Sequence, residues 1–482
     1  MIGSAQPAIL AIAVLAVGAG LVVGLKNWRW SIYGLLAYIP VSGIAILFAY
    51  GHSRSERAVA VLAKDFVFVI PAYVGFLWSS FRTRTAPWFR GAPLVLFGLL
   101  ALVVVVQAFN PKLPNHLVGI IGIKIWLFYV PLFFLGYFLV RSREQLFPLL
   151  GFMGVLAVVP AVVGLATAIL YWAGESAFVY RIYGDAAAPA TQNYQVFLLP
   201  GGCTLRRVPS TFSFFYQYYF FLAAMLAVSY AWWRGSRPAG RQLLIGGGLF
   251  VLLLAAIFTS GLRGAFVFVP PLVLGILGLS WRSPNRIPLV ACAIGLAGFA
   301  AAAAIMGTAV CGLTGHIRET LTRETPDVIT GSVATAVHKT WLGLGAGSDS
   351  VGARYAFPDV QLQTQPQGTE ESWYVKTYLE LGVFGLLIVL ALLLVLLFRL
   401  ARAHLQVRDA QLKVVSGAFV ALLFWMVLYG VKGQYVDIDP MNVYFWLFAG
   451  IVMKVAALDA TPEALGPEPE RGDLVDRVAV PS

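Results

Sequence analysis

The sequence predicts an all-α, polytopic integral membrane protein, because of its composition and the spacing of its apolar runs. Hydrophobic residues make up 59% of the 482 residues, whereas charged residues make up 12%, against roughly 25% in a typical soluble domain. The chain divides into apolar runs of about 20 residues, the length of helix that crosses ~30 Å of hydrocarbon. The net charge of +12 lies largely in short loops between these runs, which favours contact with membrane lipids and argues against nucleic acid as a partner.

Charged breaks between the apolar runs delimit thirteen candidate spans, so we expect about 12–13 transmembrane helices. The third span and the two that flank Arg263 are the least clearly delimited. We expect residues 1–457 to form one transmembrane domain and the polar, Pro-rich residues 458–482 to form a disordered cytoplasmic tail. The expected limits of the spans are 6–25, 30–50, 66–81, 92–109, 118–140, 147–174, 212–233, 242–260, 264–281, 287–309, 373–399, 413–432 and 441–457.

The distribution of basic residues among the loops predicts the orientation. Loops that follow odd-numbered spans carry sixteen Lys and Arg residues, whereas the short loops that follow even-numbered spans carry about six. Because basic loops remain in the cytoplasm, the N-terminus is expected outside and the C-terminus inside. Two long loops, 175–211 and 311–372, are then both outside, and the second is too long to be a simple connection. The polar features of the sequence face this outer side.

Arg263 lies in the segment Thr259–Gly264, between two apolar runs with almost no polar loop around it. Placing arginine in a membrane costs about 2.5–3.5 kcal/mol on insertion scales, so an ionisable residue there indicates a function. The guanidinium group is always protonated and binds phosphate through two parallel hydrogen bonds, which makes phosphate the expected ligand. The simpler alternative is a short hairpin whose arginine extends to the membrane surface.

Further candidates lie at the ends of the two long loops. Arg206 and Arg207 precede an aromatic run that begins a span, and could place donors just above the membrane. Arg318 and Arg323 lie in the second loop. In the segment Trp341–Asp349, glycines such as Gly345 and Gly347 allow the backbone to approach a ligand or to turn tightly, although no predicted strand precedes them as in a nucleotide-binding loop.

Two adjacent carboxylates, Glu370 and Glu371, lie where the second long loop re-enters the membrane. Partial burial and a like-charged neighbour raise the pKa of a carboxyl group, which suits a general base. The alternative is a helix N-terminus, which favours acidic residues through its dipole. No metal or cofactor is expected: the spacing of Asp437 and Asp439 is common by chance, and Lys124 is interpreted as a lysine that reaches the membrane surface.

In this order, these segments resemble the bacterial O-antigen ligase and polymerase superfamily over residues 200–390. Arg207–Phe212 is similar to the family pattern R-x-x-G-T-F, with Ser210 in place of glycine. Ser260–Gly264 is similar to S-x-S-R-G, with Leu262 in place of the second serine. Leu342–Ser348 is similar to P-x-x-G-x-G-x-x, with Trp341 where proline is common, and Arg323 occupies the place of a loop arginine.

The resemblance implies a glycosyltransferase of the bacterial inner membrane whose active site faces the periplasm. Its donor would be a glycan on a polyprenyl diphosphate, and its acceptor would be a second glycan. A chain-length regulator would be a further partner. Arg263 and Glu371 would be catalytic, without a metal or a cofactor and with inversion of the anomeric centre. The donor would be bound by side chains and backbone of Arg206, Arg207, Arg318, Arg323, Gly345 and Gly347.

One departure from the family pattern favours a polysaccharide polymerase. Ligases of the superfamily carry His-Asn where this sequence has Glu371-Ser372, whereas several polymerases have an acidic residue there. An O-antigen ligase or a protein O-oligosaccharyltransferase remains an alternative. The alternative from another class is a transporter or flippase of lipid-linked glycans. A flippase should place charges along the middle of several spans and show repeated halves, whereas here the charges gather at one end and no internal repeat is evident.

Overall fold

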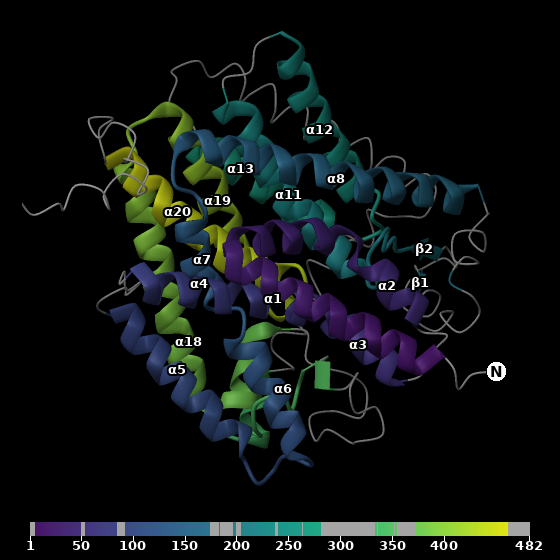
Figure 1. Cartoon of the computed structure of the whole chain (residues 1–482), viewed down its shortest axis with the longest axis vertical. Coiled ribbons are helices and arrows are strands. Elements are labelled where there is room, and N and C mark those ends of the chain that lie inside the picture. The colour runs from purple at the N-terminus through teal and green to yellow at the C-terminus, as the bar shows by residue number, and fades with distance from the viewer. Residues whose placement is uncertain are drawn as a thin grey trace, which may run out of the picture.

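The computed structural model describes residues 5–49, 54–83, 92–173, 183, 196–198, 204–236, 240–262, 264–280, 333–334, 336–350, 352–353 and 372–460. These residues form a helical membrane protein, as predicted (Figure 1). The helices are α1 (Ala5–Tyr38), α2 (Ser42–Phe48), α3 (Arg54–Lys64), α4 (Ile70–Thr83), α5 (Ala92–Ala108), α6 (His116–Leu127), α7 (Leu132–Leu139), α8 (Arg143–Trp172), α11 (Phe215–Gly235), α12 (Arg241–Phe258), α13 (Gly264–Leu279), α18 (Trp373–Gln406), α19 (Ala410–Tyr429) and α20 (Met441–Ala460).

Short elements connect several of these helices. A 3-10 turn, η1 (Ile39–Val41), follows α1, a π-helical turn, η3 (Asp65–Val69), joins α3 to α4, and a second 3-10 turn, η6 (Tyr435–Asp437), precedes α20. Within the first predicted outer loop, β1 (Val196–Leu198) and β2 (Thr204–Arg206) form an antiparallel hairpin that the sequence analysis did not predict. A π-helical turn inside a helix is often associated with a functional site, and η3 begins at the buried Asp65.

In the part of the chain that the structure describes, eight helical segments are long and apolar enough to cross a membrane, and two shorter apolar helices accompany them. They account for most of the thirteen predicted spans. The predicted spans 6–25 and 30–50 fall in one segment, whose helix α1 is broken at Asn27 (φ −159°, ψ 97°) between them. The predicted span 287–309 lies outside the described residues, and so does the tail beyond Ala460, where α20 ends three residues past the predicted limit at 457.

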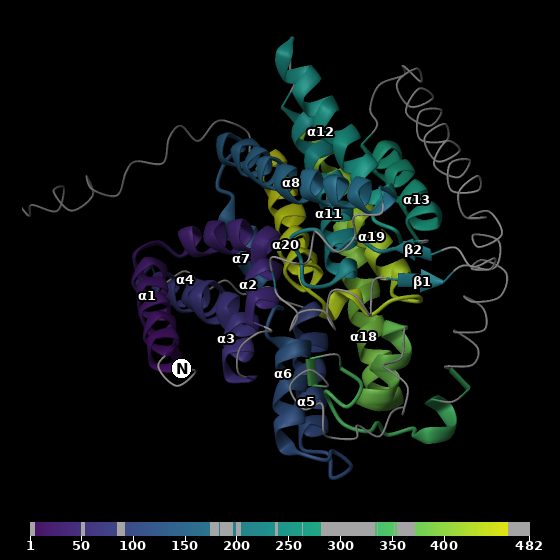
Figure 2. The same cartoon turned by 90° about the vertical axis from the view of Figure 1, so that its right-hand side faces the viewer.

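Helix α11 corresponds to the predicted span 212–233 but is not among the apolar spanning helices, because it is rich in Tyr and Trp. It lies at the centre of the molecule, in contact with α8, α12, α13, α19 and α20 (Figures 1 and 2). Most of its side chains are buried, including Tyr218, Tyr219 and Phe221 at 0% exposure. A helix that other helices shield from lipid does not need an apolar surface.

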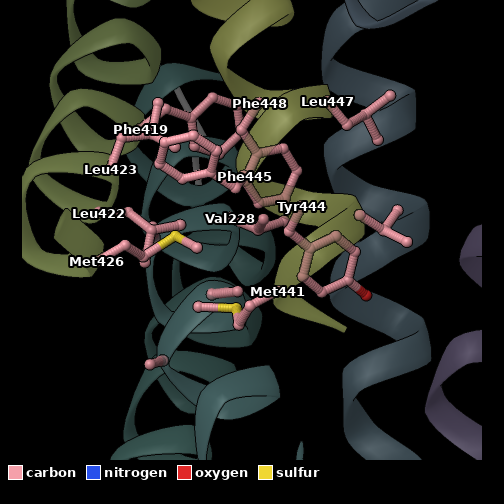
Figure 3. Packing of buried hydrophobic residues seen from close by; sticks show 14 of the residues in the cluster. Val228, Phe419, Leu422, Leu423, Met426, Met441, Tyr444, Phe445, Leu447 and Phe448 are labelled. Carbon is pink, nitrogen blue, oxygen red and sulfur yellow. The ribbon is translucent and has the colours of Figure 1, made fainter. Parts of the chain in front are cut away.

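Close packing of α20 against its neighbours accounts for the burial of its residues 441–452. A side chain added at Gly136 of α7 would collide with the backbone of Leu447, and one added at Gly450 would collide with the backbone of Phe133. Small residues at such contacts let membrane helices approach closely. On the other side of α20, the rings of Phe419 and Phe448 stack with centroids 4.5 Å apart (Figure 3).

Candidate functional site

The segment Arg207–Phe212 connects β2 to α11, and its conformation explains the glycine of the family pattern. Ser210 has a φ of 54°, in the left-handed region that side chains other than glycine rarely adopt. The Ser210 hydroxyl donates a hydrogen bond of 2.7 Å to the carbonyl oxygen of Pro160 in α8. The next residue, Thr211, donates from its hydroxyl to the carbonyl oxygen of Pro40. These contacts anchor the segment to two separate parts of the bundle.

Arg207 begins this segment. Its guanidinium carbon lies 4.5 Å from the centroid of the Phe215 ring, at the first turn of α11, in the geometry of a cation–π interaction. The backbone N–H of the next residue, Val208, donates a hydrogen bond of 2.9 Å to the carbonyl oxygen of Ser260. Arg207 is therefore close to the turn that carries Arg263. The side chain of Arg206, in β2, is not among those that the structure describes.

The turn from α12 to α13 is short and largely buried. Gly261 turns the chain with a φ of 77°, and the hydroxyl of Ser260 donates to the carbonyl oxygen of Ile257 at 2.7 Å. On the far side of Arg263, a side-chain carbon at Gly264 would lie 3.3 Å from the hydroxyl oxygen of Tyr429. Arg263 itself lies outside the described residues. On one side of it, Ser260 is hydrogen-bonded to Val208, and on the other side Gly264 lies next to Tyr429.

The C-terminal end of α19 connects this turn to the start of α18. The backbone N–H of Trp373 donates a hydrogen bond of 2.9 Å to the carbonyl oxygen of Gly430, the residue after Tyr429. The Tyr374 hydroxyl donates at 2.7 Å to the carbonyl oxygen of Val427. Ser372 is the N-cap of α18, and its side chain accepts a hydrogen bond from the N–H of Val375. The residue that directly precedes this cap is Glu371.

The segments that carry Arg207, Arg263 and Glu371 therefore meet around Tyr429. The ring of Tyr429 also contacts α11 and α13: its centroid is 5.2 Å from that of Phe220 and 4.6 Å from that of Phe268. The described structure thus brings the flanks of three predicted site residues together. Like Arg263, Glu371 itself lies outside the described residues. So do the further candidates Arg318, Arg323 and Glu370, and the positions of these side chains stay predictions.

The segment Trp341–Asp349, called the glycine-rich segment below, occupies a break in α18. Gly382 interrupts that helix with a φ of 73°, which leaves backbone groups without partners inside the helix. The segment supplies the partners: the N–H of Leu344 donates to the carbonyl oxygen of Leu379 at 2.7 Å, and the N–H of Val383 donates to that of Trp341 at 3.0 Å. Broken helices within a membrane require such replacement of their hydrogen bonds.

Gly343, Gly345 and Gly347 all have left-handed φ values of 88° to 110°, as tight turning requires. Gly345 and Gly347 are buried. A side chain at Gly345 would collide with Leu113, and one at Gly347 with the carbonyl oxygen of Val118 in α6. The two glycines thus allow the segment to pack closely against the protein itself, and their direct contact with a substrate stays a prediction.

Glu380 of α18 joins the glycine-rich segment to α6 through hydrogen bonds inside the bundle. Its carboxylate accepts a hydrogen bond of 2.7 Å from the indole N–H of Trp126 in α6, and one of 3.0 Å from the backbone N–H of Asp349. One turn earlier in α18, the Lys376 ammonium lies 3.9 Å from the Glu380 carboxylate and donates to the carboxylate of Asp437. The side chains of Glu380, Lys376 and Asp437, which form this group of ion pairs, are all almost fully buried.

A second ionic group adjoins the first through the short loop that contains Asp437 and Asp439. Lys64 is 2.8 Å from the Asp65 carboxylate and 3.1 Å from that of Asp439. Lys124 is 2.6 Å from the other oxygen of Asp65. Charges are costly in the interior of a membrane protein unless they are paired, so a paired network there indicates a function or a fixed geometry.

The sequence analysis missed the structural role of this network. It interpreted Lys124 as a residue that reaches the membrane surface, whereas its side chain is 32% exposed and pairs with Asp65. It considered Asp437 and Asp439 only as a weak metal pattern, whereas each pairs with a buried lysine. A usable signal was present at the start of the span 373–399, where Lys376 and Glu380 lie one helical turn apart in an apolar run.

Among the described residues, no group of three or more His, Cys, Asp or Glu side chains is arranged to hold a metal ion. What the structure does bring together here are backbone hydrogen bonds, packed aromatic rings and ion pairs. They can fix the positions of arginine and carboxylate side chains at the ends of the helices.

Comparison with known proteins gives one family match within the chain. A family model described as O-Antigen ligase matches residues 248–390, which include the turn at Arg263, the glycine-rich segment, Glu371 and the break in α18. A search of curated proteins gives no match. The similarity of residues 248–390 to this family, together with the apolar helices of a multi-pass membrane protein, supports the resemblance to the O-antigen ligase and polymerase superfamily of membrane enzymes.

Proposed function

We propose that this protein is a polysaccharide polymerase. It transfers a glycan from a polyprenyl diphosphate carrier to a sugar hydroxyl of a second lipid-linked repeat unit. The reaction takes place at the outer face of the bacterial inner membrane, which the predicted topology assigns to both long loops. The alternatives within the superfamily differ only in the acceptor, which is a lipid-anchored core glycan for a ligase and a protein hydroxyl for a protein glycosyltransferase.

The convergence of three segments around Tyr429 carries this proposal. The hydrogen bond from Val208 to Ser260 connects the Arg207 segment to the turn at Arg263. The contact of Gly264 with Tyr429 and the hydrogen bond from Trp373 to Gly430 connect that turn to the start of α18, next to Glu371. Two arginines and one carboxylate thus belong to segments that come together, which is the set that this transfer requires.

The arginines would act on the leaving group. In the transfer, a bond forms between the acceptor oxygen and the anomeric carbon, while the bond between that carbon and the phosphate oxygen breaks. The electron pair remains on the diphosphate, which needs charge neutralisation and no proton. Arg263 and one loop arginine, Arg323 ahead of Arg318 or Arg207, would supply fixed positive charge with paired hydrogen bonds. Arg206 would add a further donor to the glycan or the diphosphate.

Glu371 would act on the acceptor. As a general base it removes the proton of the acceptor hydroxyl, and direct displacement then inverts the anomeric centre. The anchoring of Ser372 and Trp373 on α19 supports this role, because it fixes the backbone directly after Glu371. The carboxylate at this position, where ligases of the superfamily carry histidine, supports a polymerase over a ligase.

The test is a reaction with the purified protein and lipid-linked repeat units in detergent or liposomes, with product length read on a gel. We expect long chains without ATP, nucleotide sugar or divalent metal.

Arg263→Lys should lose most of this activity while the protein still inserts and accumulates, because lysine keeps the charge but not the bidentate geometry. Full activity of Arg263→Ala would exclude Arg263. Transfer only to a core glycan or a protein would establish one of the alternatives, and movement of the lipid across liposomes without longer glycan would establish a transporter.

A further inference from the structure

A groove of about 550 Å³ lies between α18 and α20, at the end of α18 opposite to the break at Gly382. Its walls include Leu394, Val395 and Phe398 from α18 and Met453 from α20. Arg399 and Arg402 line it nearer the C-terminal end of α18. The candidate glycan-transfer site is built on the N-terminal part of α18, so this groove is a separate feature of the molecule.

The groove changes from apolar to basic along a single face of α18. Residues 394, 398 and 402 are each four apart, so they form one stripe along the helix. Leu394 and Phe398 are 68% and 66% exposed, which is the exposure expected of side chains that face lipid. Arg399 and Arg402 follow within the last two turns before α18 ends at Gln406, where a spanning helix leaves the hydrocarbon.

The two arginines have no acidic partner within the described residues: neither an ion pair nor a side-chain hydrogen bond is found for Arg399 or Arg402. The neighbouring acids are engaged elsewhere. Asp409 is 3.1 Å from Arg143, and Asp459 accepts hydrogen bonds from the backbone N–H groups of Arg408 and Asp409. Burial would raise the pKa of Asp409, but the N–H of Leu412 and the charge of Arg143 outweigh it and hold the pKa below its ordinary value. Asp409 therefore stays ionised and paired with Arg143.

We infer that this groove binds an anionic phospholipid. The phosphate of the headgroup pairs with Arg399 and Arg402, and an acyl chain lies along Leu394 and Phe398 against Met453. Basic pockets between membrane helices are established sites for anionic headgroups, and paired guanidinium groups suit a phosphate. The apolar wall gives no benefit to free inorganic phosphate, so the lipid is the source of the phosphate that fits both halves of the groove. With the predicted orientation, the lipid belongs to the cytoplasmic leaflet.

The test uses the full-length protein in a neutral detergent, with native mass spectrometry and thermal unfolding as readouts. The probes are phosphatidylglycerol, phosphatidylcholine of the same acyl composition, and inorganic phosphate. We expect the wild type to bind and be stabilised by phosphatidylglycerol, and to respond little to the other two. The paired variant Arg399→Gln with Arg402→Gln should lose about tenfold or more of its phosphatidylglycerol affinity.

Arg408→Gln is the matched control, because Arg408 is an exposed arginine near the same end of α18 that does not line the groove. We expect this variant to bind phosphatidylglycerol within about twofold of the wild type. Equal loss in the control, equal binding of phosphatidylcholine, or equal stabilisation by inorganic phosphate would each overturn the inference. The comparison of the three probes uses the wild type alone, so the inference stays testable even where the paired variant fails to accumulate.

Discussion

Val208 donates a backbone hydrogen bond of 2.9 Å to the carbonyl oxygen of Ser260. This bond joins the segment that precedes α11 to the turn between α12 and α13, so residues that are far apart in the sequence become neighbours. Arg207 precedes Val208 and Arg263 follows Ser260 by three residues. The bond therefore fixes the backbone that follows Arg207 relative to the backbone that precedes Arg263.

The conformation of Ser210 makes a first prediction. A β-branched residue in the left-handed region is strained by roughly 1–2 kcal/mol, so Ser210→Val should lower the midpoint of thermal unfolding. Ser210→Gly removes the strain of the side chain but also its hydrogen bond to Pro160, so it should stay close to the wild type. The midpoints can be measured on detergent-solubilised protein. Equal destabilisation by valine and glycine would show that the hydroxyl, and not the backbone, determines this position.

The packing of the glycine-rich segment makes a second prediction. Gly347→Ala places a methyl group against the carbonyl oxygen of Val118 in a conformation with a φ of 88°, so the segment must leave the break in α18. We expect this variant to accumulate poorly or to lose thermal stability. Gly248→Ala in α12 is the control, since a side chain there meets nothing within 4 Å, and alanine in a helix stabilises by up to about 1 kcal/mol. A Gly347→Ala protein as stable as this control would contradict the packing role.

The buried ion pair of α18 makes a third prediction. Asp437→Asn leaves Lys376 fully buried without its closest carboxylate, and the loss of one partner from a buried pair typically costs about 3–5 kcal/mol. The further change Lys376→Met should restore part of the stability, because it removes the unpaired charge. Asp409→Asn is the control, because its pair with Arg143 is partly exposed and worth at most about 1 kcal/mol. Thermal unfolding measures all four proteins. Similar small losses in Asp437→Asn and Asp409→Asn would contradict the role of the buried network.

The charge asymmetry of the loops makes a fourth prediction, about orientation. Single cysteines introduced at Ala187 and Ser332, in a background without the three native cysteines, should react with a membrane-impermeant thiol reagent in intact spheroplasts. A cysteine at Arg237, in a predicted cytoplasmic loop, should react only after lysis. The reverse pattern would place the candidate site on the cytoplasmic face.

The sequence predicted the fold class and most helix positions because both depend on local composition. An apolar run of spanning length must form a helix in lipid, wherever it lies in the molecule. The breaks were equally local: Asn27 lies between two predicted spans, and the kink of α1 is at that residue. The β1–β2 hairpin was missed because three-residue strands have too few residues for a detectable alternation.

The candidate site was predictable only in part. The arginine and glutamate candidates come from the resemblance and from the cost of charge in a membrane, and their roles stay predictions; the structure describes only the segments beside Arg263 and Glu371. The role of the glycines did not follow, because a left-handed φ serves a ligand or a packed backbone equally well, and only the contact of Gly347 with α6 distinguishes them. The pairing of Lys376 with Asp437 connects two helices through a loop, and no spacing in the sequence encodes such a contact.

The measurement that tests the account most directly compares glycan transfer and donor binding in Glu371→Gln. If Glu371 removes the proton of the acceptor hydroxyl, the variant should lose about 10² to 10⁴ in transfer rate while it binds the lipid-linked donor nearly as well as the wild type. Glu370→Gln is the matched control and should be milder, because Glu370 would act only through its neighbour or the helix dipole. Transfer by Glu371→Gln at the wild-type rate, with purified protein and lipid-linked repeat units, would contradict the account.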